Sequence, residues 1–141
     1  MKKILLPVDG SDFCLKAYDI AISFAEKFGA EIIVLNVADI EPGFTQTFIT
    51  QNFQTMDEYL KARAETIIEG AKSKFEGSDI KVTFHIATGD PAAEIIDMAE
   101  REECDMIIIC THGMSGAKRF LIGSVASKVV HHASMPVFVI R

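Results

Sequence analysis

The chain has 141 residues, 49% of them hydrophobic, and its 14 basic and 20 acidic side chains give a formal net charge of -6. This length fits a single domain with one sizeable core, so we expect one domain over residues 1–141. An acidic chain offers no basic surface to nucleic acid or to an anionic membrane, and both are excluded as partners. No apolar run approaches the ~20 residues of a membrane span, and none is long enough for a signal-peptide core.

The first half of the chain alternates between apolar runs and a helical period. Residues 3–8 and 31–37 are nearly continuous apolar runs, which is typical of strands covered on both faces. Between them, small and apolar residues recur at spacings of three and four, with Ser11 as the expected N-cap and Gly29 as the stop. The one long connection covers residues 38–52, and a loop of this length suits a functional flap or an interface.

The second half continues the same alternation with shorter links. Three more strands are predicted, over residues 80–87, 104–110 and 136–140. Three more helices are predicted, over residues 56–75, from Asp90 onward, and over 124–132. Asp90 is the expected cap of its helix because Pro91 follows in the first turn, where proline is well tolerated.

This order of elements defines a fold class. Strands that alternate with helices through short links require crossover connections, and these produce a parallel sheet. We therefore predict a doubly wound α/β domain, with a five-stranded parallel sheet and helices on both faces. Ligands of such sheets bind beyond the carboxyl ends of the strands, where the strand order reverses. Three segments end strands at that edge: PVDGSD, NVADIE and CTHGMSGAKRFLIGSV.

The third of these segments has the features of an anion site. It supplies glycines for close backbone approach, and Ser124 opens the helix that follows. The first N–H groups of a helix favour phosphate and other anions. The segment matches neither of the two commonest phosphate-binding fingerprints, G-x-x-x-x-G-K-[ST] and G-x-G-x-x-G.

The stretch THGMSGAKRFLIGSV, with the start KKILLPVDGSD and the end PVFVIR, resembles the universal stress protein family over the whole chain. The nucleotide loop of the ATP-binding branch of this family reads G-x2-G, nine residues, then G-[ST]. Gly113, the nine residues 114–122 and the pair Gly123-Ser124 match the second and third parts, while Cys110 occupies the position of the first glycine. The resemblance implies a Rossmann-like fold, similar to adenine nucleotide alpha hydrolases, with strand order 3-2-1-4-5.

The resemblance also implies a site for ATP or AMP, with or without Mg2+. The implied contacts are Pro7, Val8, Asp9 and Val37 for the adenosine, Ile109 and Cys110 for the ribose, and Gly113, Gly123, Ser124 and Val125 for the phosphates. This division is physically sound because a carboxylate suits ribose hydroxyls and repels phosphates, which are left to N–H groups and a hydroxyl. Family members typically form dimers through the last strand, so the resemblance implies a homodimer through residues 136–140.

The leading interpretation is a stress-response regulatory protein whose nucleotide occupancy alters its dimer or its partners. One alternative is a slow ATPase or a self-phosphorylating enzyme with Ser124 or Ser127 as acceptor. The sequence shows no carboxylate pair or Walker-type lysine to support it, and we predict no catalytic residue. A receiver-type phospho-acceptor domain ranks last, because Ala87 and Thr88 stand where its aspartate would be. A further alternative is a family member that has lost the nucleotide and acts through protein contacts.

The cysteines suggest a reducing compartment. Cys14, Cys104 and Cys110 are odd in number and show no C-x-x-C spacing. This pattern argues against both a disulfide framework and a zinc site. We therefore expect a cytoplasmic protein with reduced thiols and no metal centre.

Overall fold

The structure, a computed structural model, describes residues 1–39, 55–111 and 122–141. Its strands are β1 (Lys3–Pro7), β2 (Glu31–Ala38), β3 (Val82–Thr88), β4 (Met106–Cys110) and β5 (Val137–Ile140). They form one parallel sheet in the order β3-β2-β1-β4-β5. The predicted doubly wound α/β class and its strand order are confirmed. The predicted flap at 38–52 lies almost wholly outside the described residues.

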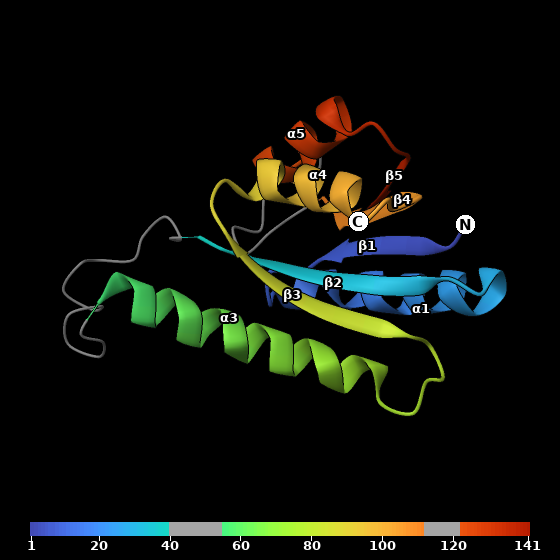
Figure 1. The fold of residues 1–141 in the computed structure, drawn as a ribbon, viewed down its shortest axis with the longest axis horizontal. Coiled ribbons are helices and arrows are strands. Elements are labelled where there is room, and N and C mark those ends of the chain that lie inside the picture. Colours follow the sequence, from blue (N-terminus) through green and yellow to red (C-terminus); the bar gives the residue numbers. More distant parts are fainter. Residues whose placement is uncertain (40–54, 112–121) are drawn as a thin grey trace.

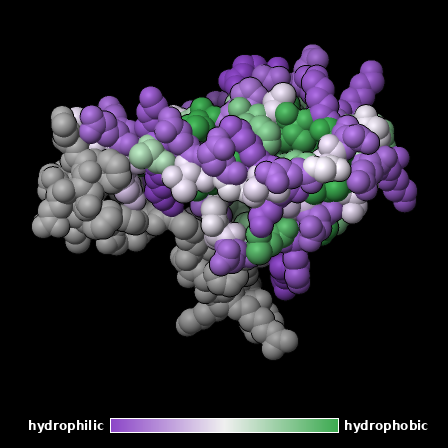
Figure 2. All heavy atoms as spheres, turned by 90° about the horizontal axis from the view of Figure 1, so that it is seen from below, coloured by the Kyte–Doolittle hydropathy of each residue, from purple (hydrophilic) through white to green (hydrophobic). Residues whose placement is uncertain are grey.

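Helices cover both faces of the sheet (Figure 1). They are α1 (Leu15–Phe28), which follows the 3-10 turn η1 (Asp12–Cys14), α3 (Met56–Lys72), which continues into the 3-10 turn η2 (Ser73–Phe75), α4 (Pro91–Arg101) and α5 (Ser124–His132). In Figure 1, α1 and α3 lie on one side of the sheet and α4 and α5 on the other. Seen from the side of α3, the surface is mostly hydrophilic, with hydrophobic side chains between (Figure 2). Among the described residues, no helix is long and apolar enough to cross a membrane.

The core has two layers because strand side chains alternate between the faces of the sheet. Ile4 and Leu6 of β1 pack toward α1 and α3. Leu5, between them, packs toward α4 and α5. All three are fully buried, and burial of one such side chain contributes about 1.5–3 kcal/mol. This two-sided burial explains why the central strands are continuous apolar runs in the sequence.

Helix ends follow the predicted signals with one exception. Asp90 accepts a hydrogen bond from Ala93 N at 3.0 Å, and Gly29 ends α1 in the left-handed conformation, with φ 65°. Ser11 was expected to cap the first helix, and this was wrong. Its hydroxyl makes no cap hydrogen bond, because the chain first forms η1 and the Ser11 N–H donates to Asp9 Oδ1.

Candidate functional site

The strand order reverses between β1 and β4. From β1 the chain continues to β2 and β3 on one side, and β4 is followed by β5 on the other. Ligands of doubly wound sheets bind beyond the carboxyl ends of strands at this reversal. The predicted positions Pro7 to Asp9, Val37, Ile109 and Cys110 fall at or near the carboxyl ends of β1, β2 and β4, three adjacent strands. The structure therefore brings these sequence-distant residues to one edge of the sheet.

The end of β1 is held by its neighbour β2. Val8 N donates to Leu35 O at 2.8 Å, and Asn36 Nδ2 donates to Val8 O at 2.8 Å. The Asn36 side chain is buried, and its Oδ1 has no hydrogen-bond partner among the described residues. Sequence analysis missed Asn36, although one polar residue inside the apolar run EIIVLNVA was a visible signal. It fixes the backbone from which Asp9 projects.

Asp9 lies in a tight turn directly after β1. Its Oδ1 accepts a hydrogen bond from Ser11 N at 2.9 Å. Gly10, the next residue, has φ +81°, and a Cβ there would lie 2.9 Å from Ile67 Cγ1 of α3. Both observations require glycine at position 10. The turn therefore holds the half-buried Asp9 carboxylate at the edge of the sheet.

Asp9 also affects a tyrosine beneath the turn. Burial of the Tyr18 side chain, and second the nearby charge of Asp9, raise the pKa of Tyr18 to about 12. The Tyr18 hydroxyl consequently stays protonated at neutral pH. The Tyr18 ring packs edge-to-face on Phe75, with ring centroids 5.8 Å apart, and this contact holds the tyrosine in place near Asp9.

The end of β4 connects to the start of α5 through Thr111. Thr111 N donates to Ile140 O of β5 at 2.8 Å, and Gly123 N donates to Thr111 O at 2.6 Å. This second bond brings Gly123, one glycine of the predicted phosphate loop, to the end of β4. Gly113, the remaining glycine of that prediction, lies outside the described residues.

Helix α5 starts differently from α3 and α4. Thr55 and Asp90 cap those two helices with side-chain oxygens, whereas the N-cap of α5 is Gly123, which has no side chain to offer. A helix start leaves several N–H groups without an intrahelical acceptor, and phosphates bind such groups well. Ser124 and Val125 therefore present backbone donors beside the end of β4, next to Gly123, whose own N–H is bonded to Thr111 O.

Several predicted residues contribute backbone only. The side chains of Val37, Ile109 and Val125 pack into the core layer below α4 and α5. Cys110 keeps regular strand geometry as the last residue of β4, so glycine is not required at this position. Its side chain packs on the α1 side of the sheet.

The expectation of unpaired cysteines was wrong for two of the three. Cys14 of η1 and Cys110 are joined as a disulfide, with their Cα atoms 5.8 Å apart. They are separated by 96 residues in the sequence, so no local spacing pattern could have revealed the pair. Cys104 is a free, buried cysteine.

The described residues contain no group of three or more His, Cys, Asp or Glu side chains arranged to hold a metal ion. What the proposed positions do offer is the Asp9 carboxylate, the backbone donors at the start of α5 and the hydroxyl of Ser124. This donor set suits a ligand with both hydroxyl and anionic groups.

Comparisons with known proteins agree on one family. A model described as the Universal stress protein family matches residues 1–141. A universal stress protein of Methanocaldococcus jannaschii is 35% identical over 140 residues, which cover 99% of this chain and 82% of the relative. The solved structure of universal stress protein UspA from Lactobacillus plantarum has a TM-score of 0.81 and 29% identity, covering 99% of this chain and 97% of its own.

A more distant structure shares the fold. The universal stress protein from Archaeoglobus fulgidus, solved in complex with dAMP, has a TM-score of 0.73 and 24% identity. The match covers 100% of this chain and 98% of that one.

Proposed function

Because the chain belongs to the universal stress protein family, we propose that it is a stress-response regulatory protein that binds ATP or AMP at the carboxyl edge of its sheet. The observation that carries this proposal is the start of α5. Its glycine N-cap offers no side-chain acceptor to the first-turn amides, and the Gly123 N–H to Thr111 O bond docks them at the end of β4. The dAMP complex of the Archaeoglobus relative supports an adenine nucleotide as the ligand.

The proposed binding mode separates the charges of the ligand. Asp9 accepts hydrogen bonds from the ribose hydroxyls, and the amides of Ser124 and Val125 receive the phosphates, with Gly123 allowing close approach because it has no side chain. A carboxylate placed against phosphate would be repelled, so the two contacts lie on different strand ends. The backbone at Val37 and Ile109 borders the adenosine, because the side chains of both residues are committed to the core.

A thermal-shift titration with AMP and ATP tests the proposal directly. At a ligand concentration of one hundred times Kd, binding adds about 2.7 kcal/mol to the free energy of unfolding. For a domain of this size we expect a rise in Tm of about 8 °C. Absence of any shift with millimolar AMP, ADP and ATP contradicts the proposal.

Matched variants locate the site. Asp9→Asn keeps the size of the side chain and removes the charged acceptor, so it should weaken AMP binding at least tenfold. Asp19→Asn alters an exposed carboxylate on α1 and should leave AMP affinity unchanged. Equal affinity of the two variants would remove Asp9 from the site.

We further propose that the protein is a homodimer through β5. This strand is at one end of the sheet, so the backbone groups of its outer side are open to pairing with another chain. Phe138 of β5 is 38% exposed and contacts Phe24 of α1 edge-to-face at 5.5 Å, with Phe28 stacked on Phe24 at 5.9 Å. A strand edge flanked by exposed aromatic side chains suits a second copy of the same strand.

Sedimentation or light scattering of Val139→Asp tests the dimer. The side chain of Val139 is partly buried against the α4 and α5 layer, so a charge there should give a monomer or an aggregate. Phe138→Lys places a charge on an exposed position of the same strand and should give a folded monomer. A dimer that survives both changes places the interface elsewhere.

A further inference from the structure

Two cysteines meet next to the proposed nucleotide site. Cys14 ends η1, the turn that follows Asp9, and Cys110 is the last residue of β4. Cys14 is 6% exposed, and Cys110 is half-buried. Their Cα separation of 5.8 Å lies within the range that a disulfide spans without movement of the backbone. The fold is therefore compatible with both the dithiol and the disulfide.

The third cysteine, Cys104, is as buried as Cys14, at 6% exposed, but it is not joined to another cysteine. Cys104 is buried and free, and burial raises its pKa to about 11, so almost none of it is thiolate at neutral pH. A thiol reacts with oxidants as the thiolate and needs access to them. Cys104 consequently supplies an internal control within the same chain.

We propose that Cys14 and Cys110 form a reversible disulfide that regulates nucleotide binding, a regulatory role that rests on the function proposed above. The pair connects the two segments on either side of the strand-order reversal. One sulfur belongs to η1, which directly follows the turn that holds Asp9. The other belongs to the strand end that carries Thr111, whose carbonyl oxygen holds the Gly123 N–H.

The chemistry balances with a peroxide as the oxidant. The thiolate of Cys110, the more exposed of the two, attacks one peroxide oxygen and breaks the O–O bond, which gives a sulfenic acid and releases hydroxide. The Cys14 sulfur then attacks the sulfenic sulfur, an S–S bond forms, the S–O bond breaks and a second hydroxide leaves. The two thiol protons convert both hydroxides to water. Two thiols and one hydrogen peroxide thus yield one disulfide and two water molecules, and a small dithiol reverses the change.

The disulfide strengthens nucleotide binding because it fixes the ribose and phosphate contacts relative to each other before the ligand arrives. Preorganisation of this kind lowers the ordering cost of binding. We expect AMP to bind the oxidised chain about three to ten times more tightly than the reduced chain. Thermodynamic linkage requires the reciprocal effect. Saturating AMP should therefore shift the equilibrium between dithiol and disulfide toward the disulfide by the same three- to tenfold factor.

The redox pair is tested first without nucleotide. Stoichiometric hydrogen peroxide should remove two hydrogens from the mass of the chain and leave one titratable thiol of the three. The Tm should rise by about 10 °C, since a bond across 96 residues constrains the unfolded chain strongly, and dithiothreitol should reverse the rise. Cys104→Ala should behave like the wild-type chain, and Cys14→Ala should show neither change. A disulfide that involves Cys104, or three thiols after oxidation, overturns the proposal.

The regulatory role is tested by calorimetric titration of AMP into oxidised and reduced wild-type chain. The expected result is tighter binding by the oxidised chain, with Cys14→Ala fixed at the reduced value whatever the oxidant. Equal affinities of the two forms overturn the regulation and leave the proposed function intact. If the disulfide forms and neither form binds AMP, the proposed function and the regulation fail together, while the redox pair is confirmed.

Discussion

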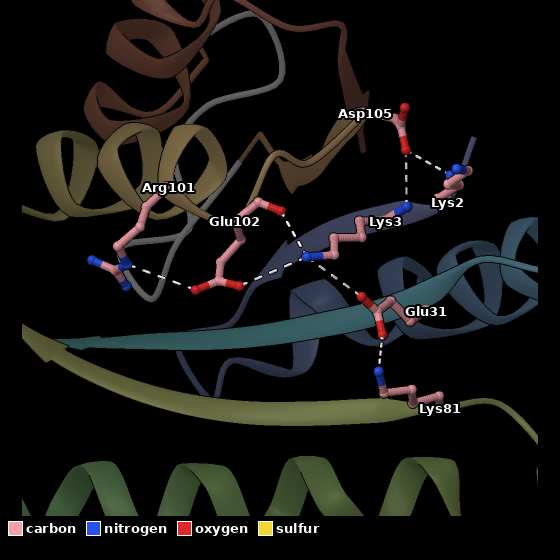
Figure 3. A network of polar contacts seen from close by, with 7 residues as sticks. All are labelled: Lys2, Lys3, Glu31, Lys81, Arg101, Glu102 and Asp105. Carbon is pink, nitrogen blue, oxygen red and sulfur yellow. Dashed lines mark hydrogen bonds and ion pairs between the residues drawn. The ribbon is translucent and has the colours of Figure 1, made fainter.

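At the amino edge of the sheet, charged side chains bond to one another, whereas the proposed site at the carboxyl edge combines the Asp9 carboxylate with the backbone donors at the start of α5. Lys3 Nζ donates to Glu102 O at 2.9 Å and pairs with Glu31 Oε1 at 3.6 Å (Figure 3). Glu31 also pairs with Lys81, whose hydrogen bond is the main reason why the pKa of Glu31 is lowered. Asp105 Oδ2 accepts from the backbone N–H groups of Lys2 and Lys3, at 2.6 and 2.9 Å.

In this fold the edge held by charged side chains (Figure 3) lies opposite the edge at which we propose that the nucleotide binds. Carboxylates at the amino edge bind ammonium and N–H groups of the same chain, so they hold neighbouring strands together. At the carboxyl edge, α5 begins at Gly123 without a side-chain cap, although α3 and α4 both have one. Backbone donors at a helix start that the N-cap side chain does not satisfy are suited to bind a ligand.

The largest expected effect comes from breaking the carboxyl edge at Gly10. Gly10→Ala places a Cβ at φ +81° and 2.9 Å from Ile67 Cγ1, which adds backbone strain to a packing clash. We expect a loss of about 3 kcal/mol in the free energy of unfolding, measured by urea denaturation. Gly29→Ala is the matched control, because position 29 has φ +65° and open space around it. It should cost about 1 kcal/mol, and equal losses would disprove the clash.

The second-largest effect is expected from a substitution that blocks access to the backbone donors of α5 without unfolding the protein. Gly123 has φ -58° and ψ 155°, a conformation that any residue adopts, so Gly123→Val should fold normally. Its two methyl groups block close approach to the α5 amides, and the AMP-induced gain of about 2.7 kcal/mol at one hundred times Kd should vanish. A thermal-shift experiment measures both the Tm of the free variant, which reports its folding, and the rise in Tm on addition of AMP. A normal AMP shift in this variant would mean that the phosphates bind elsewhere.

A smaller effect is expected at Cys110. Because this residue has regular strand geometry and its side chain packs on the α1 side, glycine is not required there. Cys110→Gly, compared with the reduced wild-type chain by calorimetry, should change ATP affinity less than about tenfold, or 1.4 kcal/mol. If the wild-type chain does not bind ATP and Cys110→Gly binds it tightly, the Cys110 side chain blocks the site.

The smallest effect concerns the amino edge and pH. Two backbone hydrogen bonds lower the pKa of Asp105, and lysine contacts lower that of Glu31. A carboxyl group with a lowered pKa in the folded state contributes stability above its unfolded pKa, and this is lost as the pH falls through the folded pKa. The Tm should therefore fall below about pH 4.5, with AMP affinity at neutral pH unaffected by Asp105→Asn. In that variant the acid-induced fall should be shallower, and an unchanged slope would contradict the assignment.

The sequence was sufficient for the fold because the fold depends on local patterns. Burial on both faces makes β1 and β2 continuous apolar runs, and Gly29 and Asp90 mark helix ends by their own backbone and side-chain preferences. Strand order 3-2-1-4-5 followed from the family resemblance and is confirmed.

Long-range contacts could not be predicted in the same way. The Cys14–Cys110 pair joins positions 96 residues apart, and Asn36 matters only because the end of β1 lies beside it. Ser11 was predicted to cap the first helix, but the chain forms η1 there before α1 begins, and the Ser11 hydroxyl makes no cap hydrogen bond. The candidate site residues in and next to β1, β2, β4 and α5 were predicted from the positions of the family motif. Only the structure shows which of their side chains pack into the core.

The Thr111 amide proton, bonded to Ile140 O, is a natural probe of hydrogen exchange. It exchanges with solvent only when β5 parts from the end of β4, so its rate reports how often that side of the sheet opens. The Gly123 amide proton, bonded to Thr111 O, reports the undocking of the start of α5 in the same way. The two protons lie on one chain of bonds from β5 to α5. If a ligand slows the exchange of both protons by the same factor, β5 and the start of α5 open as one cooperative unit. Unequal factors would show that they open as two separate units.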